Sequence, residues 1–118
     1  MNDTVAALHD RRMIEELVYR WACARESDDW NVLADCFHAD AHIHNSWTSA
    51  TAWTSATGEE FAKRSRAMAV ARKPGVHMKH IISDPWGEVR GTRGFRRSNA
   101  ALLIRDDKCR QWMNGGAY

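Results

Sequence analysis

The order of helical and extended patterns along the chain predicts an α+β fold with an antiparallel sheet. Helical periodicity fills the first part of the 118 residues, and alternating patterns follow from residue 76 onward. Helices and strands do not alternate, as they would in a parallel α/β protein. A chain of this length fits one domain and can bury a core without a disulfide or a metal. We therefore expect a single domain over residues 1–118.

A long amphipathic helix is predicted from a cap at Asp3 or Thr4 to Glu26. Its apolar positions follow the i, i+3, i+4 and i+7 spacing of one helix face: Ile14, Leu17, Val18 and Trp21. Charged residues occupy the opposite side of the helix. We therefore expect the apolar stripe to face a core.

The next part of the chain predicts two further helices with a short strand between them. Residues 27–29 interrupt the first helix and can cap a second one, whose apolar residues are Trp30, Leu33, Ala34 and Phe37. Residues 41–46 are predicted to form the strand. Residues 47–57, rich in Ser, Thr, Ala and Trp, are expected to form a loop or lid. The third helix is predicted to start at Gly58 and to stop at Pro74.

Three strands are predicted in the last part of the chain. In the first, alternation places one set of side chains on one face: Val76, Met78, His80 and Ile82. Residues 84–87 indicate a bulge or turn in or after this strand. Residues 98–105 and 109–113 are predicted to form the other two strands, joined by a turn at residues 106–108.

Composition and charge argue against several classes of function. The net charge of +2 does not indicate a nucleic-acid partner. The three cysteines form no C-x-x-C pair, so a disulfide framework or a zinc site is not expected, and a reducing compartment is. The N-terminus is too charged for a signal peptide, and no apolar run reaches membrane-spanning length. We expect a cytoplasmic protein that binds neither nucleic acid nor a membrane.

Glu26 and His80 are the candidate acid/base pair. Glu26 ends the first helix, and His80 belongs to the apolar face of the first strand. A carboxylate beside a histidine would orient the imidazole ring and raise its basicity, which makes His80 a candidate general base. The alternative interpretation is a surface glutamate at a helix end and a hydrogen-bonded core histidine.

Two further clusters of polar residues each have two interpretations. The first could supply metal ligands, since two of its histidines project to one strand face, and consists of His38, Asp40, His42 and His44. No further ligand follows at a recognisable spacing, so a polar edge is favoured and no metal is predicted. The second could contact phosphates and consists of Arg90, Arg93, Arg96 and Arg97. Nearby acidic residues favour a solvated hairpin instead.

An aromatic residue, a carboxylate, an Asp-Trp pair and a Phe-x-x-Asp-Ala segment follow one another in the chain, at Trp21, Glu26, Asp29-Trp30 and Phe37 to Ala41. In this pattern the chain resembles the SnoaL-like branch of the nuclear transport factor 2-like superfamily. Within the superfamily, scytalone dehydratase and the bile-acid dehydratase group show the strongest resemblance. The segments that carry it are Tyr19 to Ala22 for the first, and His77 to His80 and Asn114 to Ala117 for the second.

The resemblance implies a cone-shaped, curved antiparallel sheet wrapped around the N-terminal helices, a cystatin-like roll with an apolar cavity. Members usually have a further strand after the position of Tyr118, so the last strand is expected to be missing here. An open sheet edge invites pairing with another chain, and we therefore expect a homodimer.

The resemblance also implies a carboxylate–histidine pair, which falls on Glu26 and His80, and requires no cofactor. The carboxylate of the dehydratases is usually Asp, which is one methylene shorter than Glu26. Their pocket tyrosines are not reproduced, because Trp21, Arg25 and Asn45 stand at those places.

The leading hypothesis is a small-molecule lyase or isomerase, of the dehydratase kind, that acts on a hydrophobic ring compound. His80 would take a proton from the substrate, Glu26 would orient the imidazole ring of His80, and Tyr19 or Asn45 would bind the substrate oxygen. The residues expected to line the cavity are Trp21, Trp30, Phe61, Met78 and Ile82. The second hypothesis is a non-catalytic module of the same fold that binds a small ligand or forms a dimer.

Overall fold

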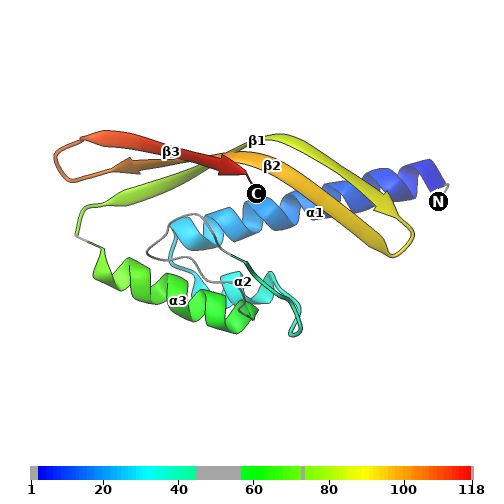
Figure 1. Ribbon diagram of the computed structural model, residues 1–118, viewed down its shortest axis with the longest axis horizontal. Coiled ribbons are helices and arrows are strands. Elements are labelled where there is room, and N and C mark those ends of the chain that lie inside the picture. Colours follow the sequence, from blue (N-terminus) through cyan, green and yellow to red (C-terminus); the bar gives the residue numbers. More distant parts are fainter. Residues whose placement is uncertain (1–2, 45–56, 73, 118) are drawn as a thin grey trace. The chain divides into compact units, whose positions relative to one another are not determined.

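The computed structural model of the chain describes residues 3–44, 57–72 and 74–117. Within these described residues, three helices come first and an antiparallel three-stranded sheet comes last (Figure 1). This arrangement confirms the predicted α+β class. The expected loop or lid at residues 47–57 lies outside the described residues, apart from Thr57.

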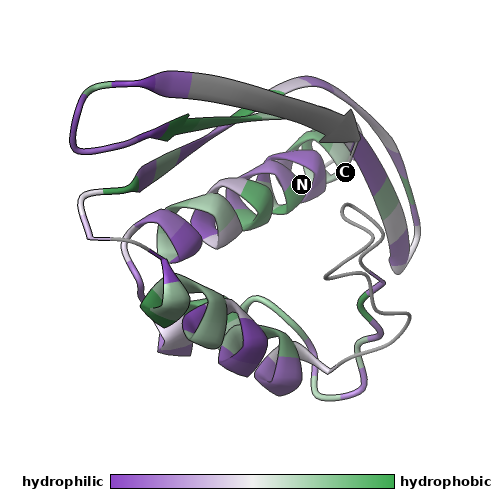
Figure 2. Ribbon diagram, turned by 60° about the vertical axis from the view of Figure 1, so that its left-hand side comes forward, coloured by the Kyte–Doolittle hydropathy of each residue, from purple (hydrophilic) through white to green (hydrophobic). Residues whose placement is uncertain are grey.

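Helix α1 spans Asp3–Glu26, as predicted, and carries polar and apolar residues interspersed along its whole length (Figure 2). Ile14 and Val18 are half-buried, but Leu17 is 39 % exposed, so its predicted place in the core is wrong. Leu17 lies about 60° around the helix from Ile14, on the side away from Val18. It therefore stands at the margin of the apolar stripe.

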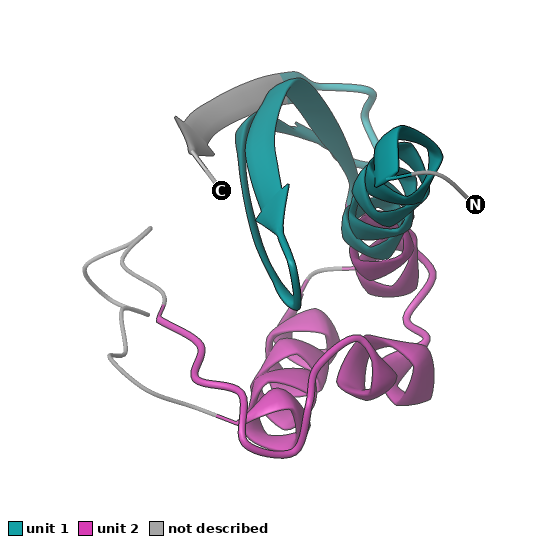
Figure 3. Cartoon of the chain, turned by 90° about the vertical axis from the view of Figure 1, so that its right-hand side faces the viewer, with its two compact units in different colours: residues 1–19, 77–118 teal, residues 20–76 magenta. Residues whose placement is uncertain are grey.

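The chain divides into two compact units, which Figure 3 shows in different colours. Unit 1 consists of residues 1–19 and 77–118, and unit 2 consists of residues 20–76. Helix α1 contributes to both, with its N-terminal part in unit 1 and its last residues in unit 2.

Unit 2 is built from the end of α1, α2 (Trp30–Asp35) and α3 (Gly58–Ala71). Both short helices start at side-chain caps. Asp29 Oδ1 accepts a hydrogen bond from the Val32 N–H at 3.2 Å. At α3, the Thr57 hydroxyl accepts from the Glu60 N–H, and the Glu60 carboxylate accepts from the Thr57 N–H, which is a capping box. The buried residues of this unit's core are Ala24, Leu33, Phe61 and Ala62.

The predicted strand at residues 41–46 is wrong over its described part. Residues 41–44 have no regular secondary structure. The Ala41 N–H donates to the His38 carbonyl at 3.0 Å, so the chain turns here, and no described strand pairs with these residues. Alternation of side chains alone therefore did not identify a strand.

Unit 1 contains a sheet in the order β1 (His77–Arg90), β2 (Arg93–Arg105) and β3 (Gln111–Ala117), with both neighbouring pairs antiparallel. The first two strands extend further than predicted, since they form one long hairpin. Gly91, with a φ of 59°, occupies its turn, in the left-handed conformation that glycine adopts without strain. The basic residues at 90–97 thus lie on and beside this hairpin.

A β-bulge interrupts β1, as the Asp84 to Gly87 segment predicted. Ser83 pairs with Asn99, but Trp86 pairs with Arg97, so β1 has one residue more than β2 in this interval. The Asp84 carboxylate accepts hydrogen bonds from the Ser83 hydroxyl at 3.2 Å and from the Asn99 amide at 3.1 Å. These bonds hold the bulge to the neighbouring strand.

The third strand starts at Gln111, two residues later than predicted. Asp106 is the reason, because its Oδ1 accepts hydrogen bonds from the N–H groups of Lys108 and Arg110. Cys109 has a φ of 59°, and so belongs to the turn.

The N-terminal part of α1 lies against the β1–β2 hairpin within unit 1. Arg11 donates a hydrogen bond from its guanidinium to the Gly87 carbonyl at 2.9 Å. A Cβ on Gly94 would lie 2.9 Å from Ile14 Cδ1. Glycine at this position therefore permits the close approach of helix and strand.

Candidate functional site

His80 is a buried histidine on the inward face of β1. Its residue is only 6 % exposed, whereas His77, Lys79 and Ile81 on the opposite face are exposed. Met78 and Ile82 share the inward face, and His80 pairs directly with Leu102 of β2. The predicted alternation is confirmed, and the imidazole ring lies among apolar neighbours on its sheet.

The same face of β2 carries two polar residues that were not predicted to form a site. Ser98 is 2 % exposed, and Arg96 donates from Nε to the Ser98 hydroxyl at 3.0 Å. The prediction of a solvated hairpin is therefore wrong for Arg96, although Arg93 and Arg97 are exposed. Counting back by twos from buried Ala100 would have placed Arg96 on this face.

Tyr19 lies beside Arg96 in unit 1. The guanidinium carbon of Arg96 is 5.8 Å from the centre of the Tyr19 ring, which is within the range of a cation–π contact. Tyr19 is 44 % exposed. Among the described residues, the structure thus brings this expected oxygen-binding residue together with a cation.

Three of the expected cavity residues come together in unit 2. The rings of Trp21 and Phe61 stack with their centres 6.4 Å apart, and Trp30 contacts the same core cluster. The Arg25 guanidinium lies over both rings, 5.2 Å from Trp21 and 5.6 Å from Phe61. Phe61 is only 6 % exposed, so its ring is part of the core of this unit.

Glu26 is the last residue of α1 and is half-buried in unit 2, whereas His80 belongs to unit 1. The Glu26–His80 pair stays a prediction. Asn45, the other expected oxygen-binding residue, lies outside the described residues.

The three cysteines are free, and Cys36 is the buried one. Burial raises the pKa of the Cys36 thiol, the nearby Arg20 lowers it, and Asp35 raises it, with a net increase. A raised pKa leaves little thiolate at neutral pH, so Cys36 is unsuited to nucleophilic catalysis.

Within residues 3–44, 57–72 and 74–117, no three His, Cys, Asp or Glu side chains gather closely enough to hold a metal ion. No helix in this part of the chain is long and apolar enough to span a membrane.

The described residues form an α+β protein in which the N-terminal part of α1 lies against an antiparallel sheet, and this sheet carries a buried histidine. The SnoaL-like domain family matches residues 6–118, and the chain belongs to this family. The resemblance predicted from the sequence is therefore confirmed. In addition, 42 residues are 40 % identical to a protein of Aspergillus terreus (strain NIH 2624 / FGSC A1156) named "Uncharacterized protein". This match covers 36 % of the chain and 16 % of that protein.

Solved structures show the same fold. One is Rv3472 from Mycobacterium tuberculosis, described as a protein of unknown function, with a TM-score of 0.82 at 18 % identity over 100 % of this chain and 64 % of that one. A second is the beta subunit of the benzoate 1,2-dioxygenase from Burkholderia mallei, with a TM-score of 0.70 at 17 % identity, over 88 % and 73 %. A third is an M. tuberculosis LEH-like epoxide hydrolase, with a TM-score of 0.55 at 15 % identity, over 87 % and 69 %.

Proposed function

We propose that the chain is a cofactor-independent lyase or isomerase, of the dehydratase kind, that acts on a hydrophobic ring compound. The observation that carries the proposal is the burial of His80, 6 % exposed, beside Met78 and Ile82 in a member of the SnoaL-like family. A buried histidine among apolar residues can accept a proton from carbon without competition from bulk water.

In the proposed reaction, His80 removes a proton from a carbon next to an electron-withdrawing group. The electron pair of the broken C–H bond moves toward the substrate oxygen, where a hydrogen bond from Tyr19 or Asn45 stabilises the negative charge. In a dehydration, this electron pair then expels a hydroxyl group, which takes up the proton and leaves as water. In an isomerisation, the electron pair instead takes up the proton at another carbon. Glu26 would orient the imidazole ring and stabilise its charged form.

The proposal requires a cone-shaped sheet around the N-terminal helices, a cystatin-like roll in which Glu26 reaches His80. It includes a cavity lined by the residues expected from the sequence: Trp21, Trp30, Phe61, Met78 and Ile82. It also takes residues 1–118 as a single domain, in a cytoplasmic homodimer.

A thermal-shift screen tests this proposal with a panel of ring ketones and ring alcohols. The matched pair of variants is His80→Ala and His77→Ala, because His77 lies on the exposed face of the same strand. Compounds that bind the pocket should raise the melting temperature of the parent and of His77→Ala, and not that of His80→Ala. Equal stabilisation of all three proteins would contradict a role for His80.

Turnover is tested on the compounds that bind. Mass spectrometry should detect loss of water or formation of an isomer with the parent protein. His80→Gln and Glu26→Gln should each slow this conversion by about 100-fold or more, as expected for loss of general-base catalysis. Full activity of either variant would remove that residue from the mechanism.

The second candidate function is a non-catalytic ligand-binding or dimerisation module. One observation favours it: Trp86 and Phe95 form an aromatic pair, with ring centres 5.1 Å apart, and are 61 % and 49 % exposed. Exposed aromatic surface of this kind is typical of association sites. Light scattering on the parent and on Trp86→Ser tests it, since a dimer that uses this pair should dissociate in the variant. Ligand binding without turnover would favour this second function over the first.

A further inference from the structure

The guanidinium of Arg96 has hydrogen-bonding capacity that the described residues do not use. Its Nε donates to Ser98, but Nη1 and Nη2 are buried without a hydrogen-bond partner among the described residues. Arg stays charged at any pH a protein tolerates, and a buried charge without hydrogen bonds is costly. Two adjacent N–H groups in this state fit a carboxylate, which binds a guanidinium through both oxygens.

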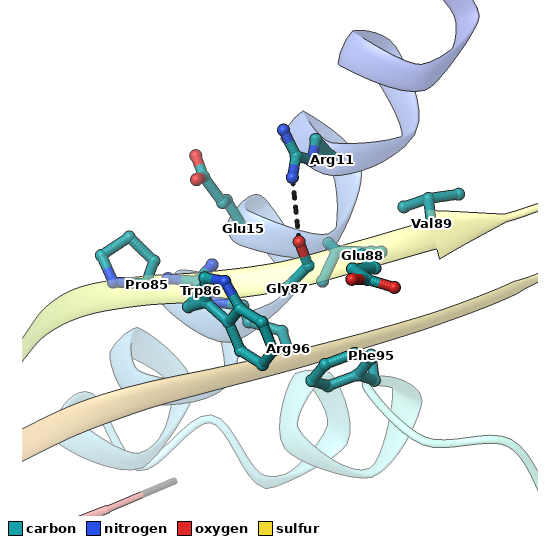
Figure 4. Close-up of a pocket in the computed structure, with 10 residues that line it drawn as sticks. Arg11, Glu15, Pro85, Trp86, Gly87, Glu88, Val89, Phe95 and Arg96 are labelled. Atoms are coloured by element: carbon teal, nitrogen blue, oxygen red, sulfur yellow. Dashed lines mark hydrogen bonds between the residues drawn. The ribbon is translucent and has the colours of Figure 1, made fainter.

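Arg96 lines a hollow between α1 and the β1–β2 hairpin, entirely within unit 1 (Figure 4). The volume of this hollow is about 190 Å³. A cavity of about 150 Å³ is known to hold a benzene molecule, so this one is large enough for a single six-membered ring with a carboxylate. The apolar residues of its wall are Ile14, Pro85, Trp86, Val89 and Phe95.

The other charged groups around the hollow already have partners. Arg11 donates to the Gly87 carbonyl, as Figure 4 shows. Glu15 lies 3.9 Å from the Arg12 guanidinium, and Glu88 lies 2.8 Å from that of Arg90. Neither carboxylate is within hydrogen-bond distance of Arg96. The unsatisfied charge on this wall is therefore positive.

We propose that this hollow binds a monocyclic carboxylic acid, with the carboxylate on Arg96 and the ring against Ile14 and Val89, which lie on the same side of the hairpin as Arg96. The Tyr19 ring at 5.8 Å supports the guanidinium plane from one side. The two terminal nitrogens are buried in the unliganded protein, so a side chain at the rim moves aside on binding.

The site is distinct from the proposed catalytic histidine. His80 pairs with Leu102, and Arg96 lies six residues before Leu102 on the same strand. At the rise of a β-strand, this separation is roughly 20 Å, which exceeds the length of a one-ring acid. One such ligand therefore cannot touch both residues, and the acid site stands whether or not His80 is catalytic.

Calorimetric titration of the full chain with phenylacetate, and with its neutral isostere phenylacetamide, tests the proposal. We expect phenylacetate to bind the parent about tenfold or more tightly than the amide, because charge-assisted hydrogen bonds form only with the acid. Arg96→Gln should abolish this preference. Arg97→Gln, an exposed neighbour on the opposite face of the same strand, should keep it.

Two results would overturn the proposal. One is binding of phenylacetate to Arg96→Gln with the affinity of the parent. The other is the lack of any preference for acid over amide in the parent, which is the result expected if water alone fills the hollow. The second comparison needs no variant, so it decides the question even if Arg96→Gln does not fold.

Discussion

The Asp106 carboxylate holds the turn between β2 and β3 through Arg110. The Arg110 backbone N–H donates to Oδ1 at 2.8 Å, and its Nε donates to Oδ2 at 2.6 Å. Lys108 adds a third N–H at 3.0 Å. Burial acts to raise the pKa of Asp106, but these hydrogen bonds and the Arg110 charge outweigh it, so the pKa lies below its ordinary value.

The substitution Asp106→Asn should therefore reduce the free energy of unfolding, by an amount that depends on the pH. The folded-state pKa is depressed, so the stabilisation is present above the unfolded-state pKa of about 3.9 and is lost as the pH falls through the folded-state pKa. Urea unfolding should show a clear difference between parent and variant at pH 7 and a smaller one at pH 3. The control is Asp107→Asn, at the exposed neighbouring position. A difference that grows on acidification would contradict this account.

Gly87 has no room for a side chain. A Cβ built there would overlap the backbone carbonyl oxygen of Phe95 on the neighbouring strand. We expect Gly87→Ala to lower the stability by about 1–3 kcal/mol, since backbone must shift. Gly91→Asn is the comparison, because a side chain there meets open space and Asn tolerates positive φ. Chemical denaturation should rank the alanine variant well below the asparagine variant, and the reverse order would refute the predicted overlap.

Leu33 is a fully buried large side chain of unit 2, with 0 % exposure. Leu33→Ala should cost about 2–5 kcal/mol, through lost burial and the cavity it leaves. Val70 on α3 is 79 % exposed, and Val70→Ala should change the stability by less than about 0.5 kcal/mol. Urea midpoints of both variants measure the contrast. Similar midpoints would mean that Leu33 is not in a close-packed core.

The capping box at α3 should contribute measurably to its stability. Thr57→Ala removes the hydroxyl that accepts from the Glu60 N–H and should cost about 0.5–2 kcal/mol. Thr57→Ser keeps that hydroxyl and serves as the control. Thermal unfolding followed by circular dichroism compares the two, and an equal loss in both variants would count against the cap.

Local sequence signals predicted most of the elements, because they depend on neighbours in the chain. The end of α1 at Glu26, the start of α3 at Gly58 and the alternation around His80 are of this kind. The Trp21–Phe61 stack joins residues 40 positions apart, so no local pattern announces it. The inward position of Arg96 could have been read by alternation along β2, but the hollow beside it depends on which residues of β1 face α1.

That facing changes its numbering at the bulge at Asp84, where two residues of β1 stand opposite one residue of β2. Before the bulge, even-numbered residues such as His80 face inward; after it, Gly87 takes that side, opposite Arg96. Deleting the extra residue would leave Ser83 opposite Asn99 and Trp86 opposite Arg97, so every side chain of β1 would keep its face and only the local kink of the bulge would be lost. Single-residue deletions at this position should therefore be tolerated among homologues.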